Sequence, residues 1–86
     1  MIVEPDHRII AHGHHKMVLL DHQGGHAVIV AERHGDRWGI NAIDTDHGTT
    51  ADTRYDAIYA MTEMALALLP KDGYSTQVQP GLLEMP

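Results

Sequence analysis

The chain has no cysteine and no phenylalanine, and it has few cations. Without cysteine it carries no disulfide framework, no thiolate zinc site and no thiol redox chemistry. Lys and Arg total 6 against 12 Asp and Glu, which gives a formal net charge of -6. Tracking a phosphate backbone needs clustered basic residues, so we expect no binding to nucleic acid by this chain on its own.

Long hydrophobic runs are also absent. The longest apolar stretch, Met64 to Leu69, is far shorter than the roughly 20 residues that a membrane-spanning helix needs. Residues 1–10 include Glu4, Asp6 and Arg8, where a signal peptide would be apolar. We therefore expect no membrane association and a cytoplasmic location. The 86 residues predict one small domain over residues 1–79 and a C-terminal tail over 80–86.

Short apolar runs with β-branched residues dominate the middle of the chain. Three runs, Lys16–Asp21, His26–Arg33 and Arg37–Ile43, are joined by glycine-containing loops at 22–25 and 34–36, which predicts an antiparallel meander. Residues 44–52 are predicted to be a polar loop, and Thr53 to Leu69 a helix capped by Thr49, Thr50 or Asp52. Residues 2–11 and 74–79 could each add a strand. The expected fold is α+β: an antiparallel β-meander of three to five strands with one long α-helix packed on one face.

The predicted sheet and helix are more apolar than one packed face requires. With a three-residue second loop, Met17 and Leu19 lie beside Val28 and Val30 under the helix, while Ile29 lies on the opposite face. A two-residue turn at Gly35-Asp36 would exchange some of these faces. Because apolar surface is left over, we expect a non-enzymatic protein–protein interaction module that forms a homodimer or homo-oligomer and binds a host or partner protein. The predicted contact residues are Ile29, Met61, Met64 and Leu68.

Histidine is unusually frequent, with 8 residues against 6 Lys and Arg. In the predicted register Asp21, His26 and Asp44 lie side by side at one end of the sheet, which would suit a divalent metal ligand set, because carboxylates orient an imidazole. His12, His14 and His15 could bind a metal adventitiously. A metal-binding or metal-dependent protein is therefore the alternative function. Solvated histidines in turns are the simpler explanation, and no motif requires a cofactor.

A family resemblance covers residues 26–69. An apolar strand, the Gly35-Asp36 turn, a strand opening with Trp38, a Gly48-Thr49 loop and Thr53-x-x-Asp56-Ala57 before an alanine-rich helix resemble the small core of HicB-type antitoxins. The resemblance implies a partial ferredoxin-like fold that oligomerises and neutralises a toxin by binding it. The frequent Ala, Gly, Asp and Val are typical of GC-rich genomes such as those of actinobacteria and their phages, so an accessory protein of a phage or mobile element is consistent with the composition.

Overall fold

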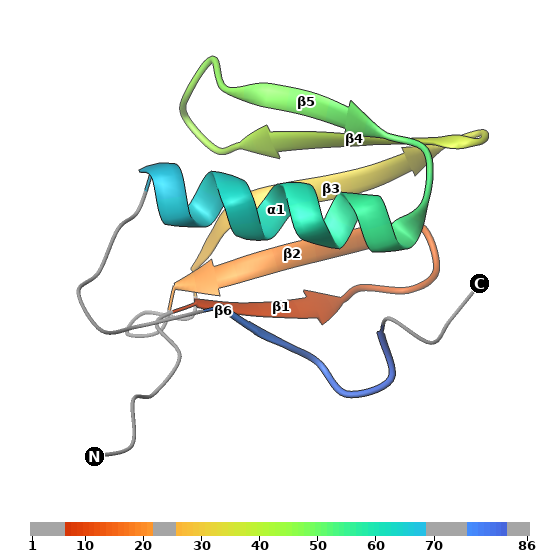
Figure 1. Cartoon of the computed structure of the whole chain (residues 1–86), viewed down its shortest axis with the longest axis horizontal. Helices are drawn as coiled ribbons and strands as arrows, with labels where there is room; N and C mark the ends of the chain where they lie inside the picture. Colours follow the sequence, from red (N-terminus) through yellow and green to blue (C-terminus); the bar gives the residue numbers. More distant parts are fainter. Residues whose placement is uncertain (1–6, 22–25, 69–75, 83–86) are drawn as a thin grey trace.

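In the part of the chain that the structure describes, the fold is a six-stranded sheet with one helix on one face (Figure 1). The computed structural model describes residues 7–21, 26–68 and 76–82. Within these residues the strand order is β5-β4-β3-β2-β1-β6, and every neighbouring pair is antiparallel except β1 and β6, which are parallel. In chain order the elements are β1 (His7–Ala11), β2 (Lys16–Asp21), β3 (Ala27–His34), β4 (Arg37–Ala42), β5 (Gly48–Ala51), α1 (Arg54–Leu68) and β6 (Thr76–Val78).

The predicted α+β class is confirmed, but the sheet has six strands and is mixed. The three central strands lie where the sequence predicts them. Parts of the expected first strand, first loop, helix end, last strand and tail, at 2–6, 22–25, 69, 74–75 and 83–86, lie outside the described residues.

The turn between β3 and β4 has two residues, Gly35 and Asp36, because His34 pairs with Arg37. Gly35 has a φ of 63°, a backbone conformation that glycine adopts without steric cost. This turn and the register shift between Leu19 and Leu20 together reverse the predicted faces of β3. Ile29 and Ala31 point to the helix, opposite Leu19 and Met17, whereas Val28 and Val30 were predicted there.

Strand β5 lies inside the segment predicted to be a polar loop, so that prediction is wrong for residues 48–51. The segment pairs with the free edge of β4, from Asn41 opposite Gly48 to Trp38 opposite Ala51. A Cβ on Gly48 would meet the Ile40 carbonyl oxygen at 3.2 Å and the Asn41 Oδ1 at 3.3 Å. Glycine therefore lets the two strands approach, while the polar threonines that follow can remain exposed on an edge strand.

Helix α1 begins at Arg54 and is capped by Thr53, rather than by Thr49, Thr50 or Asp52 as predicted. The Thr53 Oγ1 accepts a hydrogen bond of 3.0 Å from the backbone N–H of Asp56, which satisfies one of the amides that a helix start leaves unpaired. The buried positions follow the spacing of one helix face. They are Arg54, Ala57, Ile58, Met61 and Ala65.

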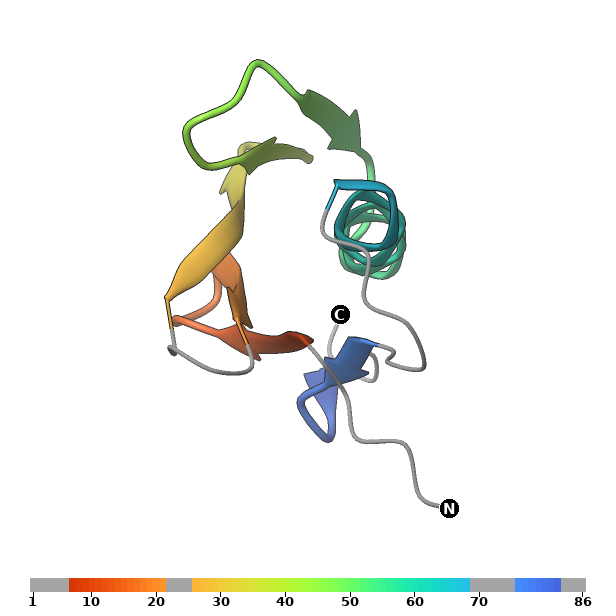
Figure 2. The same cartoon turned by 90° about the vertical axis from the view of Figure 1, so that its left-hand side faces the viewer.

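The core fills the concave side of the sheet, which curls around α1 (Figure 2). Its largest fully buried side chains come from five strands or loops and from the helix: Ile9, Met17, Leu19, Ile29, Ile40, Met61 and Leu82. Leu82, in the expected tail at 80–86, is 2% exposed and belongs to the core. The Gln79 N–H donates a hydrogen bond of 2.9 Å to the Ile9 carbonyl. This bond and the buried Leu82 side chain hold residues 79–82 against β1.

Candidate functional site

Two adjoining hollows lie beside the C-terminal half of α1. One, of about 320 Å³, opens at the end of the sheet between β3, the loop at 43–47 and Leu68. The other, of about 570 Å³, lies between α1 and the start of β5 and is lined by Tyr59, Glu63 and Met64, among others. Both include His47 and Leu68, so they form one continuous depression, which we call the groove.

Hydrogen bonds fix the loop wall of the groove. The Thr45 Oγ1 donates to the Ala42 carbonyl at 2.9 Å and accepts from the His47 N–H at 3.0 Å. The Ala42 N–H donates to the His47 carbonyl at 3.0 Å. Asp44 has a φ of 63°, the left-handed conformation that Asp tolerates better than most residues. Because both backbone groups of His47 are bonded, its imidazole is attached to a well-defined wall.

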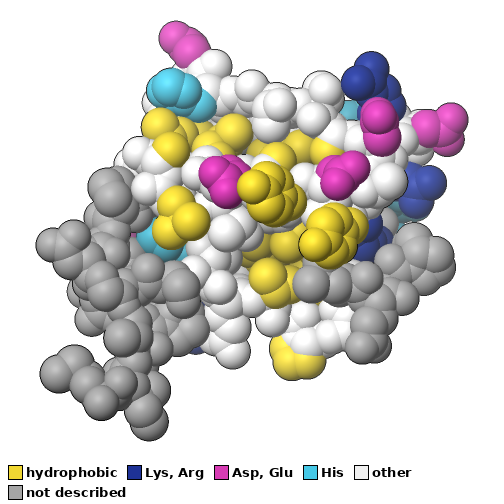
Figure 3. Space-filling view, viewed as in Figure 1, with side chains coloured by type: hydrophobic (Ala, Val, Ile, Leu, Met, Phe, Trp, Pro, Cys, Tyr) yellow, Lys and Arg dark blue, Asp and Glu magenta, His cyan; other side chains and the backbone are white. Residues whose placement is uncertain are grey.

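The helix wall is apolar with an acidic rim. Met64 and Leu68 are half-buried and pack against the core. Outside them Tyr55, Tyr59 and Leu66 are 62%, 61% and 48% exposed. Figure 3 shows this face, with apolar side chains lying between acidic ones over α1. Large apolar side chains left in water on one helix face are typical of a surface that binds another molecule.

Tyr59 and Glu63 interact across one helical turn at the rim. A hydrogen bond to the Glu63 carboxylate, followed by its negative charge, raises the pKa of the Tyr59 hydroxyl above its ordinary value of 10.0. Tyr59 is therefore a neutral hydroxyl at physiological pH, oriented by a carboxylate and open to a partner.

The structure divides the four predicted contact residues into two classes. Met64 and Leu68 line the groove, with part of each side chain at the surface. Ile29 and Met61 are 0% exposed and belong to the core, and Ile29 also lines the first hollow of the groove. Ile29 lies under the helix because the two-residue turn sets its pairing with Ala42 and the register shift between Leu19 and Leu20 sets its pairing with Leu19. Met61 lies on the helix face that packs on the sheet.

The predicted metal set of Asp21, His26 and Asp44 is not assembled. The Asp21 N–H donates to the His26 carbonyl at 2.8 Å, so these two are neighbours along the backbone ladder. However, a register shift between Leu19 and Leu20 interrupts the pairing, and β4 ends before Asp44. Within residues 7–21, 26–68 and 76–82, no three His, Asp or Glu side chains are arranged to hold a metal.

His12, His14 and His15 lie in the turn between β1 and β2, and all three are exposed. Their backbone is used structurally: the Arg33 N–H donates to the His15 carbonyl at 2.8 Å and the His12 N–H donates to the Lys16 carbonyl at 2.9 Å. Among the described residues, no three His, Asp or Glu side chains are placed to hold a metal ion, and this includes these three imidazoles.

Sequence reasoning missed Arg54, which is 7% exposed at the start of α1. A cation in the first turn opposes the positive end of the helix dipole, and this unfavourable position is the signal that could have pointed to it. It also missed the loop wall of the groove that carries His47, because a polar loop predicted at residues 44–52 implies no fixed geometry.

Comparisons of the chain with protein-family models, with curated proteins and with solved structures give no match. In the part of the chain that the structure describes, no helix has the length and apolar character needed to cross a membrane.

Proposed function

We propose that this protein is an interaction module that binds an apolar segment of a partner protein in the groove along α1. The observation that supports it is the exposed Tyr59 in the lining of the groove, with Leu66 exposed on the same helix face. Aromatic side chains often dominate the energy of protein interfaces, because they bury a large area at a low cost in conformational entropy. A partner of this kind would cover Met64 and Leu68 first.

Charge indicates the chemistry of the partner segment. Glu63 and Asp44 lie at the groove, and the chain as a whole has a net charge of -6. An apolar segment flanked by Lys or Arg would match this rim, and the opposite charges would accelerate encounter. A toxin partner, as the resemblance to HicB-type antitoxins implies, would be one case of this proposal.

The test begins with affinity purification from the native host, followed by titration of the purified partner by calorimetry. We expect Met64→Ala and Leu68→Ala together to weaken binding by about tenfold or more, since each loses roughly 1 kcal/mol of contact. Leu20→Ala, a half-buried residue of β2 outside the groove, is the matched control. Equal affinity for wild type and the groove variant, with both folded, would contradict the proposal.

A second candidate surface lies on the convex face of the sheet. Register places Ile10, Val18 and Val30 side by side on β1, β2 and β3. Val18 is 5% exposed although it lies outside the main core, so its neighbours shield it. We propose that self-association uses this strip. Sedimentation should show a dimer that Val30→Lys converts to a monomer; a wild-type protein that stays monomeric at high concentration would refute it.

A further inference from the structure

A buried arginine at the start of α1 lacks a full set of partners. The Arg54 side chain is 7% exposed, and its Nη2 donates a hydrogen bond of 3.0 Å to the His14 carbonyl. Its Cζ lies 5.4 Å from the centroid of the Trp38 ring, within the range of a cation–π contact. The other two nitrogens, Nε and Nη1, are buried and have no hydrogen-bond partner.

This arrangement leaves a desolvated cation without an anion. A buried charge is strongly unfavourable unless it is paired and its N–H groups are satisfied. Two acidic residues, Asp52 and Asp56, are equally near in sequence, and Asp52 has an ion pair of 3.3 Å with the Arg37 Nε instead. Among the described residues, Arg54 has no ion pair that would neutralise it. Its position therefore suits an anion that comes from outside the fold.

A small pocket adjoins the guanidinium. It has a volume of about 210 Å³ and is lined by Arg33, Asp36, Trp38, Asp52, Thr53 and Arg54. At roughly 30 Å³ per water, the pocket holds about seven waters, which is enough for a small acid or one acidic side chain. Arg33 is held over the turn, because its Nε donates to the Gly35 carbonyl at 3.0 Å.

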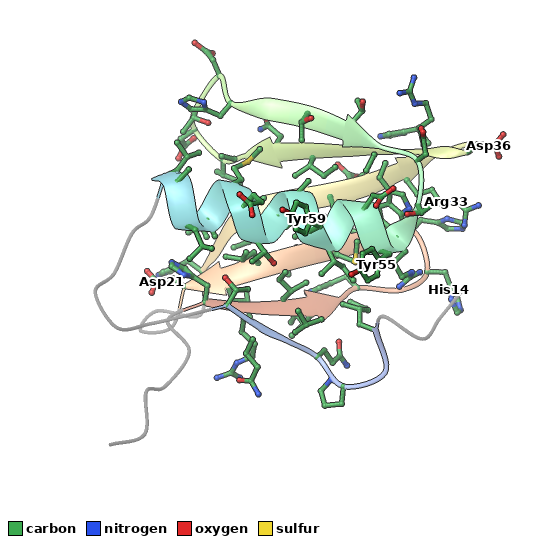
Figure 4. The ribbon with its side chains drawn as sticks, in the orientation of Figure 1. His14, Asp21, Arg33, Asp36, Tyr55 and Tyr59 are labelled. Atoms are coloured by element: carbon green, nitrogen blue, oxygen red, sulfur yellow. The ribbon has the colours of Figure 1, made fainter. Side chains whose placement is uncertain are left out.

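Charged residues of both signs gather at this end of the molecule. Of the 6 Lys and Arg in the chain, four belong to elements that meet here: Lys16 begins β2, Arg33 lies near the end of β3, Arg37 begins β4 and Arg54 begins α1. Figure 4 shows His14, Arg33 and Asp36 at the same end as the start of the helix. Glu32, Asp36, Asp52 and Asp56 lie in the same elements or turns, so the formal charges here cancel, and what favours an anion is the buried guanidinium of Arg54, whose Nε and Nη1 have no hydrogen-bond partner.

We propose that this pocket binds a carboxylate group, with Arg54 and Arg33 as its ligands and Trp38 as its aromatic wall. The planar guanidinium matches the planar carboxylate in shape and charge. Asp36 and Asp52 also line the pocket, so its lining carries two carboxylates beside its two guanidinium groups, and the choice of a carboxylate rests on the match in shape. The site lies at the N-terminal end of α1, away from the groove, so it stands independently of the proposed function.

Trp38 is the only tryptophan, so its fluorescence reports directly on this pocket. The probes are acetate, inorganic phosphate and chloride at constant pH and ionic strength, together with a capped peptide containing one Glu and the same peptide with Gln. We expect acetate to change the Trp38 fluorescence in a saturable way and phosphate to change it less. Chloride should give no saturable change at the same ionic strength. A response to the Glu peptide at much lower concentration than acetate identifies a protein side chain as the source; the reverse identifies a free acid.

The variants separate a binding role from a structural one. Arg54→Gln should weaken the acetate or Glu-peptide response by about tenfold or more, the loss expected for one charge-assisted hydrogen bond. Arg8→Gln makes the same change in charge on β1, outside the pocket, and should bind like wild type. If Arg54→Gln does not fold, Arg33→Gln provides the test, because Arg33 is exposed. The proposal is overturned if wild type shows no saturable response or responds more strongly to phosphate than to acetate. It is also overturned if the folded Arg54→Gln variant binds like wild type. Where Arg54→Gln does not fold, unchanged binding by Arg33→Gln has the same meaning.

Discussion

Replacing either of two methionines three residues apart on α1 should have different effects. Met61→Ala should mainly lower stability, and Met64→Ala should mainly weaken binding. Met61→Ala and Met64→Ala remove the same atoms from the same helix. Met61 is 0% exposed in the core, whereas Met64 is half-buried at the groove. Met61→Ala therefore leaves a cavity between the helix and the sheet. Met64→Ala removes a side chain that is partly exposed to solvent in the folded protein.

The expected losses follow from this burial. A fully buried Met→Ala change costs about 2–5 kcal/mol, because the lost transfer free energy adds to the cost of the cavity. At roughly 0.05–0.15 kcal/mol per residue, an 86-residue domain has a free energy of unfolding of about 4–13 kcal/mol. Met61→Ala should thus remove a large share of it. Met64→Ala should cost only about 1 kcal/mol, because part of its area was never withdrawn from water.

Urea unfolding followed by Trp38 fluorescence measures both losses in one assay. Trp38 is 3% exposed in the core, so its emission should change on unfolding. The dependence on urea should keep the same slope in both variants, so that the shift of the midpoint gives the change in free energy directly. Equal losses for the two variants, or a larger loss for Met64→Ala, would refute the assignment of Met61 to the core and of Met64 to the groove.

Other predictions concern local geometry. Thr53→Ala should lower the free energy of unfolding by about 1 kcal/mol in urea titrations, with Thr53→Ser close to wild type, because the cap on α1 is lost. Gly35→Ala should cost about 1–2 kcal/mol in the same assay, since its φ is 63°, whereas Gly39→Ala should be tolerated because the nearest atom to its Cβ is 4.0 Å away. Glu63→Gln should lower the pKa of Tyr59 toward 10.0, measured by ultraviolet absorbance of the phenolate. An unchanged pKa would show that the carboxylate does not act on the hydroxyl.

The central strands and the helix could be predicted because their signals are local. Apolar runs bounded by glycine turns define β2, β3 and β4, and the alanine-rich segment defines α1. The faces of β3 could not be fixed, because they depend on whether the turn to β4 contains two or three residues and on the register shift between Leu19 and Leu20. A difference of one residue moves Ile29 from one side of the sheet to the other.

Strands β5 and β6 depend on partners rather than on their own composition. The polar segment at 48–51 becomes a strand because β4 offers it a free edge, and three residues of β6 suffice because β1 lies beside them. The groove and the Arg54 pocket likewise depend on contacts between residues that are distant in sequence. Arg54 and His47 are distant in sequence from Trp38 and Leu68, which they meet only after the sheet has curled around the helix.

The parallel pairing of β1 with β6 has a consequence for folding during synthesis. β1 spans residues 7–11, but the strand beside it spans residues 76–78 and follows every other described element in the chain. Until those residues leave the ribosome, one edge of β1 has unpaired N–H and C=O groups, and the place of Leu82 in the core is empty. The closing of this edge is a long-range step, which loop-closure entropy makes slow. A ribosome-bound chain that ends before residue 76 should therefore be the form most open to chaperones and to pairing with other nascent chains.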